Sequence, residues 1–403
     1  FYNRLAAIDL ADVSEAEKFM VDTTLEDFKR AGVNKDEQTR EKIRKLRKEI
    51  SIIGNKFSKN IQQDVRSVTT TVDGLKGLPA DYIKSHPVDE NGLVTITTNS
   101  PDLSPVMKYA ESDDLRYRLR IASRSRAYPE NESILKELLT KRYELAQLLD
   151  FESWAEYSMS DNMIGGPKQA REFLTTVGHA LKGPVKKELE VELAQLRQIN
   201  PAANTIQVWQ SGYVDNLIRK QQYDLDAKEV REYFDYPNVR DGILKLTESL
   251  FGIQIRPWNT DTWHEDVETF EILEHGELLG RFYFDNHPRE GKYKHAAHFT
   301  LRSGIKDKQI PLSALAQNFP KGLMEHRQVE TFLHEFGHLL HNMFAGKQKW
   351  AGLSGMGVER DFVEAPSQML EEWIWDYDTL KTFAKDKSGK TIPRALVTKM
   401  IKA

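Results

Sequence analysis

The sequence predicts a mainly α-helical protein that carries a small β-sheet in its second half. Two patterns support this fold class. Across most of the 403 residues, apolar side chains recur every three or four positions, which is typical of amphipathic helices. Between about residues 267 and 319 the pattern changes to short runs of β-branched and aromatic residues, which are typical of strands. The length and the 39% hydrophobic content suffice for a large core and suggest two or three domains.

The first part of the chain is predicted to be helical, with turns between the helices. Residues 12–62 keep the helical spacing, apart from a turn at 31–34. Residues 92–98 are rich in β-branched side chains and are bounded by Asn and Gly residues, so they predict one short strand. The helical pattern returns from about 104 to about 252. Proline and glycine mark turns within this stretch at 129, 165–167, 183–184 and 200–201.

The sheet is predicted from four strands in the second part of the chain. Residues 267–273 and 278–284 flank a turn at 274–277 and predict a β-hairpin. Residues 295–301 and 310–319 are further strand candidates. After Glu325 the pattern returns to helix until the end of the chain.

The first of these C-terminal helices carries the chemically informative residues. Residues 334–338 read His-Glu-Phe-Gly-His. At about 100° per residue, His338 lies about 40° round the helix from His334 and one turn further along. Two imidazoles in that arrangement can chelate a single tetrahedral zinc ion. An apolar stripe at helical spacing supports the helix: Val329, Phe332, Leu333, Phe336, Leu339, Leu340 and Met343.

The residue between the two histidines suits a different task. Glu335 is rotated about 100° from His334, so it lies beside the metal without being a ligand. We expect it to act as the general base for a water molecule whose pKa the metal lowers towards about 7. Gly337 costs about 1 kcal/mol relative to Ala inside a helix. Its presence predicts that another backbone or helix approaches closely at this point.

A site with two histidines needs one further protein ligand and keeps a position for water. The segment 345–360 contains four glycines and predicts a loop that turns the chain back towards the metal. A second helix is predicted over 361–373, and Glu364, at its start, lies 30 residues after His334. The residues alone leave four competing carboxylates: Glu359, Asp361, Glu371 and Glu372.

The runs 334–341 (HEFGHLLH) and 361–368 (DFVEAPSQ) resemble the thimet oligopeptidase family, which includes neurolysin, oligopeptidase A and bacterial dipeptidyl carboxypeptidase. Segments 161–163, 263–267, 288–297 and 318–319 are similar to the family too, so the resemblance covers nearly the whole chain. It implies that Glu364 is the third zinc ligand. It also implies a zincin-like, two-lobed helical peptidase that admits short unstructured peptides to a deep channel, with its small sheet next to the helix of the two histidines.

The sequence departs from this family at its ends. The family's Gly- and Tyr-rich loop, which polarises the scissile carbonyl, lies well beyond the second helix, whereas this chain stops 39 residues after Glu364. The chain also begins at Phe1 without an initiator Met and ends without a helix cap. We therefore expect both ends to be cuts through a longer protein. We divide the chain into an N-terminal helical region, 1–105, and a zinc peptidase catalytic region, 106–403, both incomplete.

Further polar side chains are expected near the metal. As a fourth ligand, His341 would occupy the position of the water molecule. We therefore expect it to contact a ligand residue or to serve the structure, and not to bind the metal. Glu330, Gln368 and Glu371 are candidates for orienting the ligand imidazoles, with exposed helix polars as the alternative. His295 and His298 lie in a predicted strand, where one of them is a candidate for the substrate channel.

Composition excludes several other functions. The chain has no cysteine, which rules out disulfides, thiol catalysis and cysteine-liganded zinc. A net charge of −4, with mixed signs along the helices, gives no indication of nucleic-acid binding. No apolar run reaches the roughly 18 residues of a membrane helix. We expect a cytoplasmic monomer, with the periplasm as the alternative compartment.

The resulting hypothesis is a zinc-dependent endopeptidase that hydrolyses short peptides with one Zn²⁺ ion, held by His334, His338 and Glu364. We expect the sheet edge near 310–319 to pair with the extended peptide. One alternative is a peptidyl-dipeptidase of the same family. The other is a zinc- or peptide-binding fragment without turnover.

Overall fold

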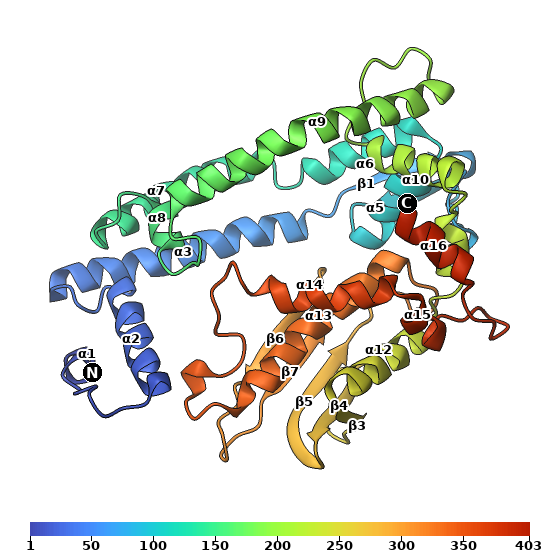
Figure 1. The fold of residues 1–403 in the computed structure, drawn as a ribbon. Coiled ribbons are helices and arrows are strands. Elements are labelled where there is room, and N and C mark those ends of the chain that lie inside the picture. The colour runs from blue at the N-terminus through green and yellow to red at the C-terminus, as the bar shows by residue number, and fades with distance from the viewer. The chain divides into compact units, whose positions relative to one another are not determined.

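The computed structural model describes residues 1–403. More than half of these residues lie in helices, and the strands form two small sheets (Figure 1). The chain divides into two compact units, Phe1–Tyr213 and Val214–Ala403, and the boundary falls within helix α10 (Ser211–Gln222). The prediction of a mainly α-helical protein with a small sheet is confirmed.

The first unit consists of helices and one two-stranded sheet. Strands β1 (Ser67–Thr71) and β2 (Leu93–Thr97) pair antiparallel. β2 matches the predicted strand at 92–98, whereas β1 was missed, although its run of Val and Thr residues is a usable strand signal. The helices are α1 (Tyr2–Ala6), α2 (Glu15–Arg30), α3 (Glu37–Gln63), α4 (Ala80–Ser85), α5 (Ser100–Tyr109), α6 (Asp113–Arg124), α7 (Glu130–Leu148), α8 (Trp154–Met159) and α9 (Pro167–Ile199), with a 3₁₀ turn η1 (Val72–Leu75).

Helices α3 and α7 form the main helix pair of this unit. Leu46 packs in one buried cluster with Leu145, while Ile53, further along α3, packs in another with Ile134, nearer the start of α7. The contacts therefore run in opposite directions along the two helices, as expected for an antiparallel pair (Figure 1). Large apolar side chains fill the space between them, which is the ordinary way that helices pack.

The second unit combines the larger sheet with the C-terminal helices. Its strands are β3 (Ile253–Pro257), β4 (Glu268–Glu274), β5 (Glu277–Asp285), β6 (Ala297–Arg302) and β7 (Leu312–Ala316). Its helices are α11 (Ala227–Arg231), α12 (Tyr236–Phe251), α13 (His326–Phe344), α14 (Glu364–Glu371), α15 (Tyr377–Phe383) and α16 (Arg394–Lys402), with 3₁₀ turns η2 (Ala345–Lys347), η3 (Ala351–Leu353) and η4 (Glu372–Trp375).

The strand order in this sheet is β3-β4-β5-β7-β6. The predicted hairpin is present as β4–β5, and positive φ at His275 and Gly276 gives the tight turn that joins its strands. β5 and β7 are parallel neighbours, while β6 returns antiparallel to β7 and forms an edge of the sheet. The expectation that 310–319 provides a free edge is wrong, because β7 is hydrogen-bonded to a strand on each side.

Helix α13 packs against one face of this sheet. Phe282 and Phe284 of β5 make ring contacts with Phe336 of α13, and Phe284 also meets Phe332, with ring centroids 5.4–5.8 Å apart. These four side chains are fully buried and belong to the large core of the unit. The core therefore fixes the helix against the sheet and leaves its polar residues on another side.

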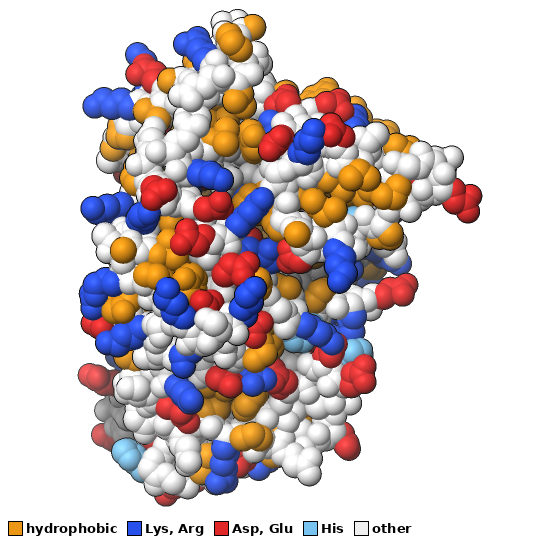
Figure 2. Space-filling model, turned by 90° about the vertical axis from the view of Figure 1, so that its right-hand side faces the viewer, with side chains coloured by type: hydrophobic (Ala, Val, Ile, Leu, Met, Phe, Trp, Pro, Cys, Tyr) orange, Lys and Arg blue, Asp and Glu red, His pale blue; other side chains and the backbone are white.

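The surface carries both signs of charge in close mixture. On the face drawn in Figure 2, basic and acidic side chains alternate without a region of a single sign. This mixture agrees with 57 basic and 61 acidic residues in the chain. None of the helices combines the length and the apolar character that crossing a bilayer requires.

Candidate metal centre

The helix that carries the two histidines is fixed at its start and along one side. Glu325 and Gln328 form a capping box at the N-terminus of α13, which satisfies two backbone N–H groups. The predicted apolar stripe is almost completely buried, with no member more than 3% exposed. The stripe sets the rotation of α13, so the directions of His334, Glu335 and His338 follow from helix geometry.

A close contact between two helices brings in the third residue. A Cβ atom added to Gly337 would lie 2.7 Å from the Cα atom of Ser367 in α14. The backbone of α14 therefore passes directly over this position, which confirms the close approach predicted from Gly337. Ser367 is fully buried, and Glu364 stands one turn earlier, at the first position of α14.

The three side chains proposed as ligands converge. The Nε2 atoms of His334 and His338 are 3.2 Å apart, and each lies 3.1 Å from Oε2 of Glu364. No other group of three or more His, Asp or Glu side chains with this arrangement occurs in residues 1–403. The competitors Glu359, Asp361, Glu371 and Glu372 are not part of the cluster.

The spacing of these three atoms fits a zinc ion. An atom equidistant from three corners about 3.1 Å apart lies at least about 1.8 Å from each, within the zinc–nitrogen and zinc–oxygen distances of about 2.0–2.2 Å. Ideal tetrahedral bonds of that length place the ligand atoms about 3.3 Å from one another. Two neutral imidazoles and a carboxylate are also a donor set that zinc commonly accepts.

Neighbouring groups orient the candidate ligands. Oε1 of Glu371 lies 2.6 Å from Nδ1 of His334, so Nδ1 carries the proton and Nε2 keeps its lone pair for the cluster. Oγ of Ser367 lies 2.9 Å from the carbonyl oxygen of Glu364 and 3.1 Å from its Oε2, and its one proton serves either acceptor. Glu330, Gln368 and Glu371 were the candidates for orienting the ligand imidazoles. Of these, Glu371 contacts an imidazole, that of His334.

Burial keeps the imidazole of His338 neutral. Burial lowers the pKa of His338, and the nearby Glu364 opposes this shift only in part. A neutral imidazole is the form that binds a metal. Burial also lowers the pKa of His341, whose Nδ1 atom is buried without a hydrogen-bond partner. His341 interacts electrostatically with His338, and its predicted supporting role stays a prediction.

Glu335 lies next to the cluster and next to the sheet. Its side chain is buried, and the backbone N–H group of His298 in β6 lies close enough to its carboxylate to affect its pKa. Burial raises the pKa of Glu335, while His334 and this N–H group act in the opposite direction. A carboxylate whose proton affinity is raised is suited to take up a proton and pass it on.

A polar network that the sequence reasoning missed joins β6, β7 and α13. Oγ of Ser313 lies 2.9 Å from Nε2 of His298 and accepts a hydrogen bond from Nδ2 of Asn342, also at 2.9 Å. Thr300 donates to Oδ1 of Asn342 at 3.1 Å. Burial lowers the pKa of His298 to about 3, so it stays neutral. His295, in contrast, is exposed and meets the ring of Tyr293.

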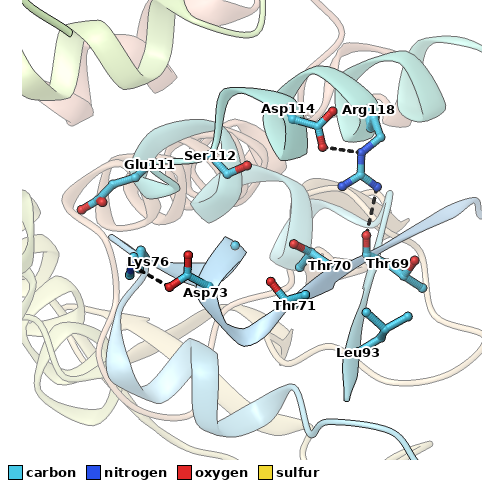
Figure 3. A pocket seen from close by; sticks show the side chains of 11 residues that line it. Thr69, Thr70, Thr71, Asp73, Lys76, Leu93, Glu111, Ser112, Asp114 and Arg118 are labelled. Carbon is cyan, nitrogen blue, oxygen red and sulfur yellow. Dashed lines mark hydrogen bonds and ion pairs between the residues drawn. The ribbon is translucent and has the colours of Figure 1, made fainter. Parts of the chain in front are cut away.

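One polar hollow of the first unit does not resemble a catalytic site. A cavity of about 620 Å³ lies between β1, β2 and the start of α6 (Figure 3). Lys76 pairs there with Asp73, and Arg118 bonds to Asp114 and to the carbonyl oxygen of Thr69. Both basic side chains are thus paired with carboxylates within the cavity, so neither is a free cation for an anionic ligand.

Comparison with known proteins adds independent evidence. The model of peptidase family M3 matches residues 106–403. Saccharolysin of Saccharomyces cerevisiae is 34% identical over 97% of this chain and 59% of its own length. Thimet-like oligopeptidase of Dictyostelium discoideum is 34% identical over 98% of this chain and 62% of its own length. Oligopeptidase A of Escherichia coli is 30% identical, again over 98% and 62%. The chain thus spans about three fifths of these relatives.

Proposed function

The chain belongs to peptidase family M3, and on that premise we propose that it forms the zinc-binding part of an oligopeptidase that hydrolyses short peptides. The family match covers 106–403 and includes both the α13 histidines and Glu364. The relatives include a thimet-like oligopeptidase and oligopeptidase A, and we transfer oligopeptidase activity from them to this chain.

One observation carries the proposal: three potential ligand atoms from two helices meet within 3.2 Å of one another. We assign one zinc ion to His334, His338 and Glu364. Glu371 then holds the imidazole of His334 in the tautomer that binds metal, and Ser367 steadies the carboxylate of Glu364. Two histidines and one carboxylate would hold the ion with the donor set that is typical of catalytic zinc sites.

When bound, zinc supplies Lewis acidity at this position and lowers the pKa of a water molecule there to about 7. Glu335 is the general base. It takes a proton from the attacking water and later gives that proton to the leaving amine of the cleaved peptide. Its buried position beside the backbone of β6 excludes bulk water from this transfer.

Of the two edge strands of the sheet, β3 and β6, the one next to Glu335, β6, is the best place for the substrate backbone. β6 is bonded to β7 on one side only, and the N–H group of His298 turns towards Glu335. An extended peptide that pairs with β6 would bring one of its carbonyl groups near the general base. This assignment replaces the expected edge at 310–319.

The finer expectations from the sequence belong to this proposal. They are a zincin-like, two-lobed architecture, an N-terminal region 1–105 followed by a catalytic region 106–403, a monomeric state and a cytoplasmic location, with the periplasm as the alternative. Light scattering on the purified protein tests the monomer, and cell fractionation tests the compartment. A stable dimer or a secreted protein would contradict these two points without affecting the metal site.

Metal analysis of the chain and of His334→Ala tests the proposal. We expect one zinc ion per chain and near-complete loss in the variant, because two ligands no longer form a tight site. His264→Ala, a histidine of the same unit outside the cluster, is the matched control and should keep its zinc. Zinc retained by His334→Ala as in the unchanged chain would refute the ligand assignment.

Turnover of a quenched-fluorescent peptide tests the activity. We expect hydrolysis by the complete open reading frame that contains this chain and much slower hydrolysis by residues 1–403 alone, since each lost oxyanion donor costs about a hundred- to a thousandfold. Internal cleavage indicates an endopeptidase, whereas release of C-terminal dipeptides indicates a peptidyl-dipeptidase. Zinc binding without turnover by either protein would identify a binding protein instead.

A further inference from the structure

A buried lysine outside the candidate metal centre has no part in the proposed chemistry. Lys292 is only 9% exposed, in the connection between β5 and β6. A buried ammonium group is costly unless its hydrogen bonds and charge are compensated. Its surroundings therefore indicate what it does for the molecule.

The ammonium group of Lys292 is held by backbone carbonyls from three places. It donates to the carbonyl oxygens of Asp285 and His287, both at 2.7 Å, and to that of Gln317. Asp285 is the last residue of β5, His287 lies in the connection that follows, and Gln317 comes directly after β7. One side chain thus joins the ends of two neighbouring parallel strands to the loop between β5 and β6.

The carboxylate of Asp285 completes this cage. Its Oδ1 atom lies 3.0 Å from the ammonium nitrogen, and Arg289 bonds to both of its oxygens at 2.5 and 2.7 Å. Trp263 donates to Oδ2 at 2.9 Å. Burial alone would raise the pKa of Asp285, but these donors lower it to about 2, so the cage stays charged at neutral pH.

A second tie holds the end of the same connection. Nδ2 of Asn318 donates to the carbonyl oxygens of Tyr293 and His295, at 2.9 and 3.0 Å. Strand β6 begins two residues after His295. The connection is therefore fixed to the residues after β7 at two points before it becomes the edge strand.

Strand β6 needs such support, because only β7 pairs with it. A shift of one residue along β7 would turn every side chain of β6 to the opposite face and would move the N–H group of His298 away from Glu335. The position of the exposed edge relative to the general base thus depends on the connection that precedes it.

We propose that Lys292 is a positioning residue, which ties the ends of β5 and β7 to their connecting loop and so holds edge strand β6 where a peptide substrate pairs with it beside Glu335. This inference rests on the proposed function for the role of β6. The structural part, that Lys292 holds β6 in place, is testable without any turnover.

Hydrogen exchange of residues 1–403, followed by mass spectrometry, tests the structural part. In Lys292→Met we expect the β6 amides of 298–301 to exchange at least about tenfold faster, because the strand opens more often. Zinc content and the exchange of α13 should stay unchanged. Lys294→Met is the matched control, since this lysine of the same loop is exposed and its replacement should leave β6 as it is.

Two further variants guard against a failure of Lys292→Met to fold. Asn318→Ala removes the second tie without burying an unpaired charge, and it should loosen β6 to a smaller extent. Lys292→Cys creates the one cysteine of the chain. Its alkylation with bromoethylamine in denaturant, followed by refolding, restores an ammonium group of nearly the same length and should restore slow exchange. Unchanged exchange of β6 in the folded variants, or no recovery after alkylation, would overturn the proposal.

Turnover by the complete open reading frame tests the functional part. In Lys292→Met we expect kcat/KM to fall on the order of tenfold to a hundredfold, as displacement of a substrate-positioning element does. The loss should be larger for an octapeptide than for a tetrapeptide, because a longer peptide pairs with more of β6. Faster exchange with unchanged turnover would refute the positioning role alone. Absent turnover by the unaltered protein would refute the proposed function alone.

Discussion

Gly54 and Gly337 are two of the glycines that lie inside helices of this protein, and their surroundings differ. Gly54 lies in α3, where an added Cβ atom would meet no other atom within 4 Å. Gly337 lies in α13, where the same atom would come within 2.7 Å of the backbone of α14. A glycine inside a helix costs about 1 kcal/mol relative to Ala in either place. Only at Gly337 does a close helix contact offset this cost.

The helix pairs α3–α7 and α13–α14 differ in what their contacts position. α3 and α7 are separated mainly by large apolar side chains, such as Leu46 and Leu145, and their polar contacts, such as Asn60 to Asn131, involve none of the candidate metal ligands. α13 and α14 approach backbone to backbone at Gly337 and Ser367, and Glu364 then lies 3.1 Å from two imidazoles. The α3–α7 pair is held mainly by apolar packing, whereas the α13–α14 pair must keep the register that brings Glu364 to the imidazoles. Changes in the two pairs should therefore affect different properties.

The largest expected effect concerns Glu335, the proposed general base on α13. Glu335→Gln should lower peptide hydrolysis by the complete protein by about a hundred- to ten-thousandfold, because an amide cannot take up the proton. Zinc should remain bound at one ion per chain. Rates and zinc content measured on the same samples check this. Loss of zinc would mean that Glu335 has a structural role or is a ligand.

The next effect belongs to the first pair. Leu145→Ala should reduce the free energy of unfolding by about 2–5 kcal/mol, because it leaves a cavity in a buried cluster. Zinc affinity should not change, because the side chain packs within the α3–α7 pair. Urea denaturation and zinc titration of the same variant test both points. A weaker metal site would show that the two helix pairs are energetically coupled.

Gly337→Ala tests the register of the second pair. The added methyl group must push α14 away from α13, since the contacted atom belongs to the backbone. Zinc affinity should fall by about ten- to a hundredfold, as when a group that supports a ligand is lost. Competition with a chelator measures the affinity. An unchanged affinity would mean that Glu364 is positioned by something other than this contact.

The smallest effect has the opposite sign. Gly54→Ala should raise the free energy of unfolding by about 0.5–1 kcal/mol, because Ala favours the helix and meets no obstacle. Thermal denaturation detects such a change. A destabilised Gly54→Ala would indicate that this glycine also serves a close contact, and the difference between the two pairs would disappear.

Much of the candidate site could be predicted because its geometry is local. The spacing of His334, Glu335 and His338 on a helix fixes their relative directions before any tertiary contact forms. Gly337 likewise signalled a close approach through its cost in a helix. The third ligand was harder to predict, because four other carboxylates were equally possible from the residues alone. The resemblance to the family indicated Glu364. The convergence of three ligand atoms supports that selection.

Other features depended on contacts between residues far apart in the chain. The sequence predicts strands near 295–301 and 310–319 but not their order, and the edge expected at 310–319 is β7, an inner strand. Strand order results from long-range pairing, which no local pattern encodes. The same holds for the network of His298, Ser313 and Asn342, whose members are 15 to 44 residues apart.

The sequence by itself thus determined the helical fold class, the hairpin β4–β5 and the face of α13 that bears two histidines, because helix and turn preferences act over a few residues. Tertiary structure alone decided which strand forms the exposed edge and gave Lys292 its three carbonyl partners. A lysine in a glycine-containing turn ordinarily faces water. Only the meeting of β5, β7 and their connection creates a place where its charge is compensated inside the protein.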